Sequence, residues 1–255
     1  MARATALITG ASGGIGLELA KLCATAGNNV VLVARRQNEL EDLASSLARK
    51  HGIAARALAV DLAEPDAPQR IFAAIGAVDI LINNAGFGLL GVFAETDWNT
   101  EARMIQVNVT ALAHLTRLYL PGMLARRQGK ILNVASTAAF VPGPLMAMYY
   151  ASKAMVLSFT LAIAAELEGT GVTATALCPG PTATNFGEVA GNSGSKLFKG
   201  AAMSAADVAR EGFAAMMAGK PEVIAGSRNR WMIWSTRFAP RRMLAGIAKR
   251  LNSAA

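Results

Sequence analysis

Short apolar segments recur along this chain, with Gly, Asn, Asp or Pro residues at their ends. The segments are Ala4–Ile8, Val30–Ala34, Arg56–Val60, Val78–Ile82, Lys130–Ala135, Val172–Cys178 and Glu222–Ala225. Most carry little or no charge, which is typical of strands buried on both faces of a parallel sheet. Stretches with helical spacing of apolar residues lie between them. This alternation predicts one α/β domain, with a doubly wound, seven-stranded, mainly parallel sheet and helices on both faces.

The composition fits a single globular domain. The chain has 255 residues, enough for one sizeable core, and only 16% of them are charged. A typical domain has about 25% charged residues, so a disordered chain is excluded. Cys23 and Cys178 lie far apart in sequence, without the spacing of a disulfide framework or a zinc site. We therefore expect no metal and a cytoplasmic location.

Neither an export signal nor a membrane span is expected. The segment Thr5–Thr9 already has the character of a buried strand, and no cleavage-site pattern follows it. The 22 residues from Ile131 to Ser152 are uncharged and long enough to cross a bilayer. Pro142, Gly143 and Pro144 interrupt them, however, and a spanning helix needs unbroken internal hydrogen bonding.

A glycine-rich segment, Thr9–Gly16, follows the first predicted strand and opens the first predicted helix. Glycines allow a sharp turn there, and they let a pyrophosphate approach the free N–H groups of the helix N-terminus. The strand–glycine–helix context favours a dinucleotide site over an ordinary tight turn. The residues expected to contact the cofactor here are Gly10, Ser12, Gly13, Gly14, Ile15 and Gly16.

The spacing of these glycines resembles the Thr-Gly-x-x-x-Gly-x-Gly signature of the short-chain dehydrogenase/reductase superfamily, which has a Rossmann-type fold. Other motifs follow in the family's order as far as Thr184. The resemblance implies an adenine contact at Asp61-Leu62 and at Asn84-Ala85-Gly86, and a nicotinamide contact at Pro179-Gly180, Thr182 and Thr184. It also implies a catalytic tetrad of Asn108, Ser136, Tyr149 and Lys153.

Tyr149 and Lys153 are four residues apart in a predicted helix, so they share one face. A free phenol has a pKa near 10. We expect the nearby ammonium to lower that pKa, so that Tyr149 can exchange a proton with a carbonyl oxygen as hydride is transferred. Ser136 would polarise the same oxygen. In the family, the residue at Asn108 supports a proton path to the lysine.

Neighbouring polar residues are weaker candidates for this chemistry. Tyr150 lacks the spacing to Lys153, and we expect Ser152 and Thr137 to be packing or capping residues. His51 and His114 are lone histidines with no partner at a catalytic spacing.

The second predicted strand ends without an acidic residue and continues as Arg35-Arg36. In dinucleotide folds, an Asp or Glu there accepts the ribose 2′-hydroxyl, whereas Arg suits a 2′-phosphate. The alternative is that both arginines are only solvated charges. Cations at a helix N-terminus oppose the helix dipole, which favours a ligand role. NADP(H) is therefore the expected cofactor, bound in part by Arg35 and Arg36.

The predicted function is an NADPH-dependent oxidoreductase that transfers hydride between the nicotinamide and a carbonyl or alcohol. Residues 181–204 would form a mobile substrate loop or lid. The residues expected to line a hydrophobic pocket are Phe140, Leu145, Met146, Met148, Phe186 and Phe198; simple core packing is about as good an explanation for any one of them.

Two other functions are considered. A 3-oxoacyl thioester (acyl-carrier-protein) reductase would share every motif, and a basic surface would suit an acidic carrier. A non-catalytic dinucleotide-sensing module would usually lack the Tyr149/Lys153 pair. No nucleic-acid recognition module is present.

The resemblance implies a homodimer or homotetramer. We expect the helix near Thr100–Arg126 and the helix Tyr149–Leu167 to pack against their symmetry mates. Small residues on the second helix would allow a close approach; they are Ala151, Ala154, Ala162, Ala164 and Ala165.

Residues 228–255 form a basic extension beyond the predicted domain of residues 1–227. They hold seven of the 25 Lys and Arg residues and none of the 17 Asp and Glu residues. Aromatic and aliphatic residues are interleaved with these cations, and Pro240 divides the segment into two predicted amphipathic helices. Such helices suit either an anionic membrane surface or an apolar contact with protein, over the pocket or between subunits. We favour the protein contact and keep peripheral membrane association as a hypothesis.

Overall fold

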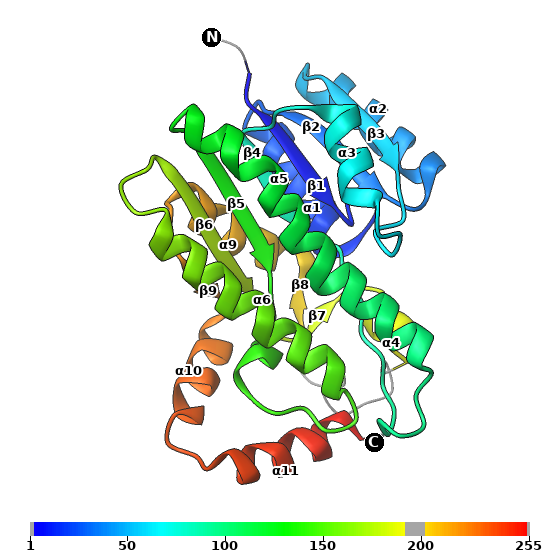
Figure 1. Ribbon diagram of the computed structural model, residues 1–255, viewed down its shortest axis with the longest axis vertical. Helices are drawn as coiled ribbons and strands as arrows, with labels where there is room; N and C mark the ends of the chain where they lie inside the picture. Colours follow the sequence, from blue (N-terminus) through cyan, green and yellow to red (C-terminus); the bar gives the residue numbers. More distant parts are fainter. Residues whose placement is uncertain (1–2, 192–201, 254–255) are drawn as a thin grey trace.

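The computed structural model describes residues 3–191 and 202–253, and its centre is a seven-stranded parallel sheet (Figure 1). The strand order is β3-β2-β1-β4-β5-β6-β9, and every neighbouring pair is parallel. The seven strands are β1 (Thr5–Thr9), β2 (Asn29–Ala34), β3 (Ala55–Ala59), β4 (Ile80–Asn83), β5 (Gly129–Val134), β6 (Val172–Cys178) and β9 (Glu222–Ile224). All seven apolar segments are strands, which confirms the predicted α/β fold.

Helices cover both faces of this sheet, because most strands are apolar on both sides. The helices on one face are α1 (Gly14–Thr25), α2 (Gln37–His51) and α9 (Ala205–Met217). The helices on the other are α3 (Ala67–Ile75), α5 (Leu112–Ala125) and α6 (Ala147–Glu166). In Figure 1, α5 and α6 cross the front of the sheet. Their inward residues Leu115 and Ile163 pack with Leu7 and Leu81 in one core.

The strand order reverses direction between β1 and β4. The chain leaves β1 for β2 and β3 on one side, then returns to add β4, β5 and β6 on the other. In open α/β sheets, ligands bind outside the carboxyl ends of the strands at such a reversal. The loop after β1, which carries the glycine segment, and the loop after β4 meet there.

The predicted long helix near Thr100–Arg126 is a composite. It consists of α4 (Trp98–Ile105), one π-helical segment η1 (Gln106–Ala111) and α5. π-helical turns are rare and are often found at functional sites. Asn108 lies within this one.

The segment predicted to be a substrate loop contains short elements. They are β7 (Thr182–Ala183), α7 (Phe186–Val189) and β8 (Met203–Ser204), and β7 pairs with β8. Residues 192–201 of the predicted lid lie outside the described residues.

Helix α6 is long and apolar enough to cross a membrane by length and composition. It packs against β6 and the short 3₁₀ helix η2 (Thr137–Phe140). Its inward face carries Tyr149 and Lys153, and both side chains are buried. These contacts are those of a core helix.

The chain ends in α10 (Ser227–Thr236) and α11 (Arg241–Asn252), the two helices predicted on either side of Pro240. They lie along the lower edge of the molecule in Figure 1. The division into residues 1–227 and 228–255 stays an interpretation, because the first of these helices already begins at Ser227.

Candidate active site

The glycine segment after β1 is held against the loop after β4. The hydroxyl oxygen of Thr9 accepts hydrogen bonds from the backbone N–H groups of Asn84 and Ala85, both at 3.0 Å. The Asn84 side chain donates back to the carbonyls of Thr9 and Gly10, at 2.9 and 3.2 Å. A Cβ atom at Gly16 would lie only 2.3 Å from the Gly10 carbonyl oxygen. This position therefore requires glycine for the close approach of helix and loop.

The N-terminus of α1 has the properties of a phosphate site. No side chain caps it, and no acidic residue lies in its first turn. A Cβ atom at Gly13 would meet no atom within 4 Å, so the backbone there faces open space. Free N–H groups and the helix dipole at such an end favour an anion. The residues fit the pyrophosphate of a dinucleotide, with Ser12 and Ile15 in the same turn.

The predicted nicotinamide segment lies beside the glycine segment. A Cβ atom at Gly14 would come within 3.0 Å of the Thr184 methyl group. The Thr182 hydroxyl donates to the Gly180 carbonyl at 2.9 Å, and the Ser136 hydroxyl donates to the Pro179 carbonyl at 3.4 Å. These contacts place residues 179–184 between the glycine segment and the predicted catalytic serine.

The residues predicted to bind the adenosine half of the cofactor differ from one another in burial and in their partners. Arg36 donates to the Ser12 hydroxyl at 3.4 Å and forms an exposed ion pair with Glu39 at 2.8 Å. Arg35 is exposed. The Asp61 carboxylate forms a 3.0 Å ion pair with Arg103 of α4. The side chain of Leu62 is buried in the core below it.

Asn108, Lys153 and the backbone at Gly86 meet at one point. The Asn108 carboxamide makes a reciprocal pair with the backbone of Phe87, accepting from its N–H at 3.0 Å and donating to its carbonyl at 2.9 Å. A Cβ atom at Gly86 would lie 3.0 Å from Asn108 Oδ1 and 3.3 Å from Lys153 Nζ. Asn108 is fully buried, so it fixes the loop after β4 from within η1.

Tyr149, Ser136 and Lys153 come together above β5. The Ser136 side chain lies close enough to the Tyr149 hydroxyl to lower the pKa of that phenol, against the effect of burial. Ser136 Oγ also accepts from the N–H of Ala138 at 3.1 Å, which fixes its rotamer. Lys153 Nζ donates to the Val134 carbonyl at 2.8 Å and lies 5.9 Å from the centre of the Tyr149 ring. The predicted tetrad is thus assembled from the loop after β5, η1 and α6.

The pKa of Tyr149 is raised in this structure, not lowered as expected. Burial raises the pKa of Tyr149 well above its usual value, and the Ser136 side chain opposes this only in part. Burial also lowers the pKa of Lys153 to about 8. Desolvation disfavours whichever form is charged, and both groups are buried. The proton therefore stays on Tyr149 at neutral pH, which suits a general acid.

Three supporting residues were not identified as such from the sequence. Thr9 joins the two loops at the strand reversal. Ser152, expected only to pack or cap, accepts from Asn108 Nδ2 at 3.1 Å and donates to the Tyr149 carbonyl at 2.6 Å. Asn252, from the C-terminal helix, hydrogen-bonds to the Tyr150 hydroxyl at 3.2 Å and to the Pro144 carbonyl at 2.9 Å. The threonine lies in the quoted motif, whereas no local pattern marks Asn252.

An apolar wall adjoins Tyr149. Met146 and Ala190 are buried in one cluster with it, and Met148 and Phe186 pack against that cluster. The rings of Tyr149 and Phe186 are 5.3 Å apart. Three of the predicted lining residues, Met146, Met148 and Phe186, are therefore at the site.

The other predicted lining residues differ. Phe140 packs in a separate cluster around Val156 and Cys178, so its assignment to the pocket is not supported. Leu145 lies in the preceding loop with a φ of 69°, and its carbonyl accepts from the N–H of Gly91. Phe198 lies outside the described residues.

Comparisons with known proteins agree with this geometry. Residues 4–193 match the family model of short chain dehydrogenases. The chain is 41% identical over 189 residues to a short chain dehydrogenase of Pseudocercospora fijiensis, covering 72% of this chain and 61% of that protein. It is 34% identical over 193 residues to a very-long-chain 3-oxoacyl-CoA reductase of Anas platyrhynchos, covering 73% and 62%. The chain thus spans about three-fifths of the length of these curated relatives.

Solved structures resemble nearly the whole chain. A short-chain dehydrogenase from Sphingobium yanoikuyae, in complex with NADPH, is similar with a TM-score of 0.81 and 29% identity, covering 99% of this chain and 98% of the other. A 7beta-hydroxysteroid dehydrogenase is similar with a TM-score of 0.87 and 27% identity, covering 96% of each chain.

The glycine segment, the helix that carries Tyr149 and Lys153, and the match to the family model all indicate the same family. The chain belongs to the short-chain dehydrogenase/reductase family.

Proposed function

We propose that the protein is an NADPH-dependent reductase of a fairly hydrophobic carbonyl compound, or the same enzyme acting on the corresponding alcohol. The observation that carries this is the meeting of Tyr149, Ser136 and Lys153 beside the uncapped N-terminus of α1. A nicotinamide held there would supply or accept the hydride. Tyr149 would donate its proton to the carbonyl oxygen, and Ser136 would stabilise the charge that develops on that oxygen.

Several features support a hydrophobic substrate. The wall beside Tyr149 is formed by Met146, Met148 and Phe186. Apolar walls with a few polar groups are the usual composition of small-molecule sites. The alternative of a non-catalytic dinucleotide sensor is not favoured, because all four tetrad side chains are present and lie close together.

A second candidate is reduction of a 3-oxoacyl thioester. Relatives named very-long-chain 3-oxoacyl-CoA reductase, for example from Anas platyrhynchos, support this candidate. The acyl chain of such a substrate would suit the same apolar wall. The basic surface would also suit an acidic phosphopantetheine carrier or an acyl-CoA.

Both candidates can be tested in one assay, with NADPH consumption followed optically. The panel contains hydrophobic ketones, 3-oxoacyl-CoA thioesters of increasing chain length, and the same thioesters on acyl-carrier protein. We expect turnover with at least one class, and a preference that rises with chain length if the thioester is the substrate. If the protein binds NADPH but turns over no compound of the panel, the proposed reductase function is contradicted and the non-catalytic dinucleotide sensor is favoured.

The preference for NADPH depends on Arg35 and Arg36. Arg36 lies within hydrogen-bonding distance of Ser12, at the edge of the phosphate site. Changing both arginines to Ala should raise the KM for NADPH at least tenfold, the effect of losing about 1.4 kcal/mol of charge-assisted hydrogen bonding. The KM for NADH should change little. Arg49→Ala, at the other end of α2, is the matched control. Equal changes for both cofactors would contradict the proposal.

We also propose that the protein forms a homodimer or homotetramer. The outward face of α6 is exposed and formed by small or apolar residues, including Ala151, Met155 and Ala162. Small residues allow two helices to approach closely. Light scattering at micromolar concentration should give a dimeric mass or more. A monomer, or a dimer unaffected by Ala162→Arg, would contradict this packing.

A further inference from the structure

The two C-terminal helices present a row of exposed apolar side chains. Trp231 and Phe238 are 71% and 73% exposed, which is unusual for large aromatic residues. The exposed apolar residues of this surface, named here the C-terminal surface, are Trp231, Trp234, Phe238, Met243, Ile247 and Leu251.

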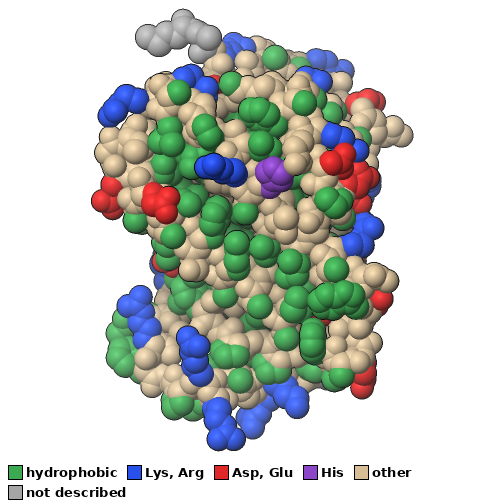
Figure 2. All heavy atoms as spheres, viewed as in Figure 1, with side chains coloured by type: hydrophobic (Ala, Val, Ile, Leu, Met, Phe, Trp, Pro, Cys, Tyr) green, Lys and Arg blue, Asp and Glu red, His purple; other side chains and the backbone are tan. Residues whose placement is uncertain are grey.

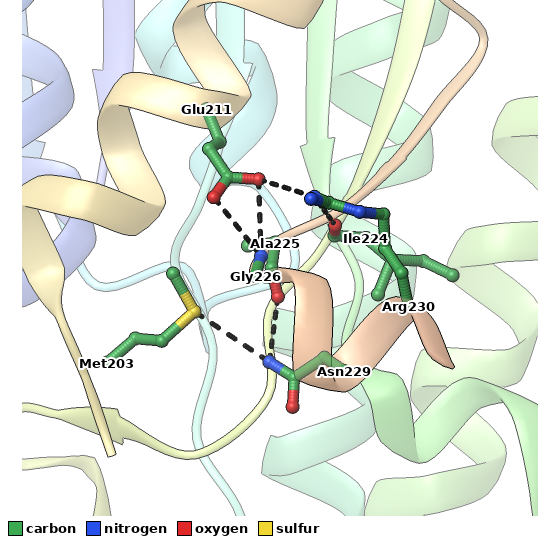
Figure 3. Close-up of polar contacts among 7 residues, drawn as sticks. All are labelled: Met203, Glu211, Ile224, Ala225, Gly226, Asn229 and Arg230. Atoms are coloured by element: carbon green, nitrogen blue, oxygen red, sulfur yellow. Dashed lines mark hydrogen bonds and ion pairs between the residues drawn. The ribbon is translucent and has the colours of Figure 1, made fainter. Parts of the chain in front are cut away.

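Helix α10 is attached to the domain by residues at its N-terminal end (Figure 3). The Glu211 carboxylate of α9 accepts from the Gly226 N–H at 3.2 Å and forms an ion pair with Arg230 at 3.0 Å. Asn229 Nδ2 donates to the Ala225 carbonyl at 2.7 Å, and Ile233 is buried. These contacts fix the rotation of α10 about its axis.

The rotation of α10 determines where its aromatic side chains lie. Trp231 and Trp234 are three residues apart in α10, so they share one helix face, and Phe238 follows just after the helix ends at Thr236. The rings of Trp234 and Phe238 are 5.0 Å apart in an edge-to-face contact. The aromatic face is thus an ordered part of the outer surface.

Helix α11 has the same two-sided character. Its inward residues Ala248 and Asn252 are buried, and Asn252 is held by Tyr150 and Pro144. Met243, Ile247 and Leu251 recur every fourth residue on another face and are exposed. The helix is therefore attached to the domain on one side and apolar on an open side.

The charges carried by residues 228–255 themselves have one sign. Residues 228–255 hold seven Lys and Arg residues and no acidic residue, whereas the rest of the chain holds 18 basic and 17 acidic residues. Among the described residues, Arg230 is the one cation of this segment with an ion pair. The cations without an ion pair to any described residue are Arg228, Arg237, Arg241, Arg242, Lys249 and Arg250. Figure 2 shows Lys and Arg side chains along the lower edge of the molecule, where α10 and α11 lie in Figure 1.

The position of two cations is locally unfavourable. Arg241 and Arg242 begin α11, where the positive end of the helix dipole repels a cation. Helix stability therefore does not explain them, whereas an external anion would. A second copy of this chain is a poor partner, because a twofold contact would bring the same unpaired cations together.

We propose that the C-terminal surface binds anionic phospholipid bilayers, with the Trp, Phe and aliphatic side chains in the interface and the cations at the lipid phosphates. Basic helices with Trp and Leu residues on an apolar face bind membranes in this way, and anionic lipid attracts the basic residues. This proposal stands on the surface of α10 and α11 and is independent of the proposed reaction.

The test is sedimentation of the full-length protein with vesicles of phosphatidylcholine and phosphatidylserine (70:30), or of phosphatidylcholine alone, at 0.1 M and 0.5 M NaCl. Point variants are used because removal of α11 would also remove the contacts of Asn252. The first variant is Arg241→Gln/Arg242→Gln, matched by Arg49→Gln/Lys50→Gln on α2. The second is Trp231→Ala/Phe238→Ala, matched by Phe93→Ala/Trp98→Ala, which are also exposed aromatic residues.

We expect binding to the anionic vesicles at 0.1 M NaCl, and weak binding to neutral vesicles or at 0.5 M NaCl. At roughly fivefold per cation, the Arg241/Arg242 variant should bind about 25-fold less tightly. The Trp231/Phe238 variant should also lose binding, whereas both controls should retain it. Circular dichroism melts establish that each variant is folded.

Three results would overturn the proposal. The first is no binding of the unmodified protein to anionic vesicles, and the second is equal binding by the variants and their controls. The third is a change of oligomeric mass in the Trp231/Phe238 variant without any vesicle binding of the parent, which would make this surface a subunit contact.

Discussion

At the scale of single residues, burial sets the protonation of the site. Tyr149 and Lys153 are 9% and 5% exposed, so each is driven toward its neutral form. The pKa of Tyr149 is raised and that of Lys153 is lowered to about 8. The tyrosine thus keeps its proton across the neutral range, and Lys153 is the first of the two groups to change charge as the pH rises.

This ordering predicts the pH dependence of carbonyl reduction. We expect kcat/KM for NADPH to be constant below about pH 7 and to fall by about tenfold per pH unit above about pH 8, as Lys153 loses the charge that favours the Tyr149 phenolate formed when the proton is donated. The folding contribution of Lys153 has the opposite sign: between about pH 8 and its unfolded pKa of 10.5 the unfolded chain binds the extra proton, so that contribution rises with pH. Loss of activity in this window would therefore not reflect unfolding at this residue. A level profile to pH 9.5 would contradict the assignment.

At the scale of secondary-structure elements, the site depends on the approach of α1 to the loop after β4. Gly16 is the point of closest contact, because a Cβ atom there would lie 2.3 Å from the Gly10 carbonyl oxygen and 2.4 Å from Asn84 Nδ2. Gly13, three residues earlier, faces open space. The two glycines therefore have different roles, one in the fold and the other at the site.

This difference predicts opposite effects for two similar substitutions. Gly16→Ala should lower the free energy of unfolding by about 1–3 kcal/mol, because the loop must move away from the helix. Gly13→Ala should leave that energy within about 0.5 kcal/mol, since its φ of −172° suits any residue, but it should weaken NADPH binding at the phosphate site. Thermal melts and fluorescence titration with NADPH measure the two effects. Wild-type NADPH affinity in Gly13→Ala would contradict the placement of the phosphates.

Local patterns were sufficient to predict many of these elements. The apolar segments identified the seven strands, and the i, i+4 spacing placed Tyr149 and Lys153 on one helix face. Long-range contacts could not be predicted in this way. The Thr9–Asn84 hydrogen bonds span 75 residues, and the Tyr150–Asn252 bond spans 102. The predicted direction of the shift in the Tyr149 pKa is also wrong, because this shift depends on burial by several elements at once.

At the scale of the whole molecule, the tetrad and the cofactor cradle come from one end of the sheet, and α11 closes on the same end. Asn252 ties that helix to Tyr150 and to the loop at Pro144, immediately beside Tyr149. The rings of the two tyrosines are 6.0 Å apart and nearly perpendicular. The two adjacent tyrosines are buried to a similar extent but have different roles. Tyr149 faces Ser136, whereas Tyr150 holds the C-terminal helix α11.

The central claim is that Tyr149 is the proton donor, and the most direct measurement is the single-turnover rate of NADPH oxidation by Tyr149→Phe and by its neighbour Tyr150→Phe. We expect Tyr149→Phe to lower the rate by roughly 100-fold or more, with NADPH affinity unchanged. Tyr150→Phe, which loses only the hydrogen bond to Asn252, should keep the rate within about threefold. A Tyr149→Phe enzyme that turns over at the parent rate, or a larger loss in Tyr150→Phe, would contradict the account.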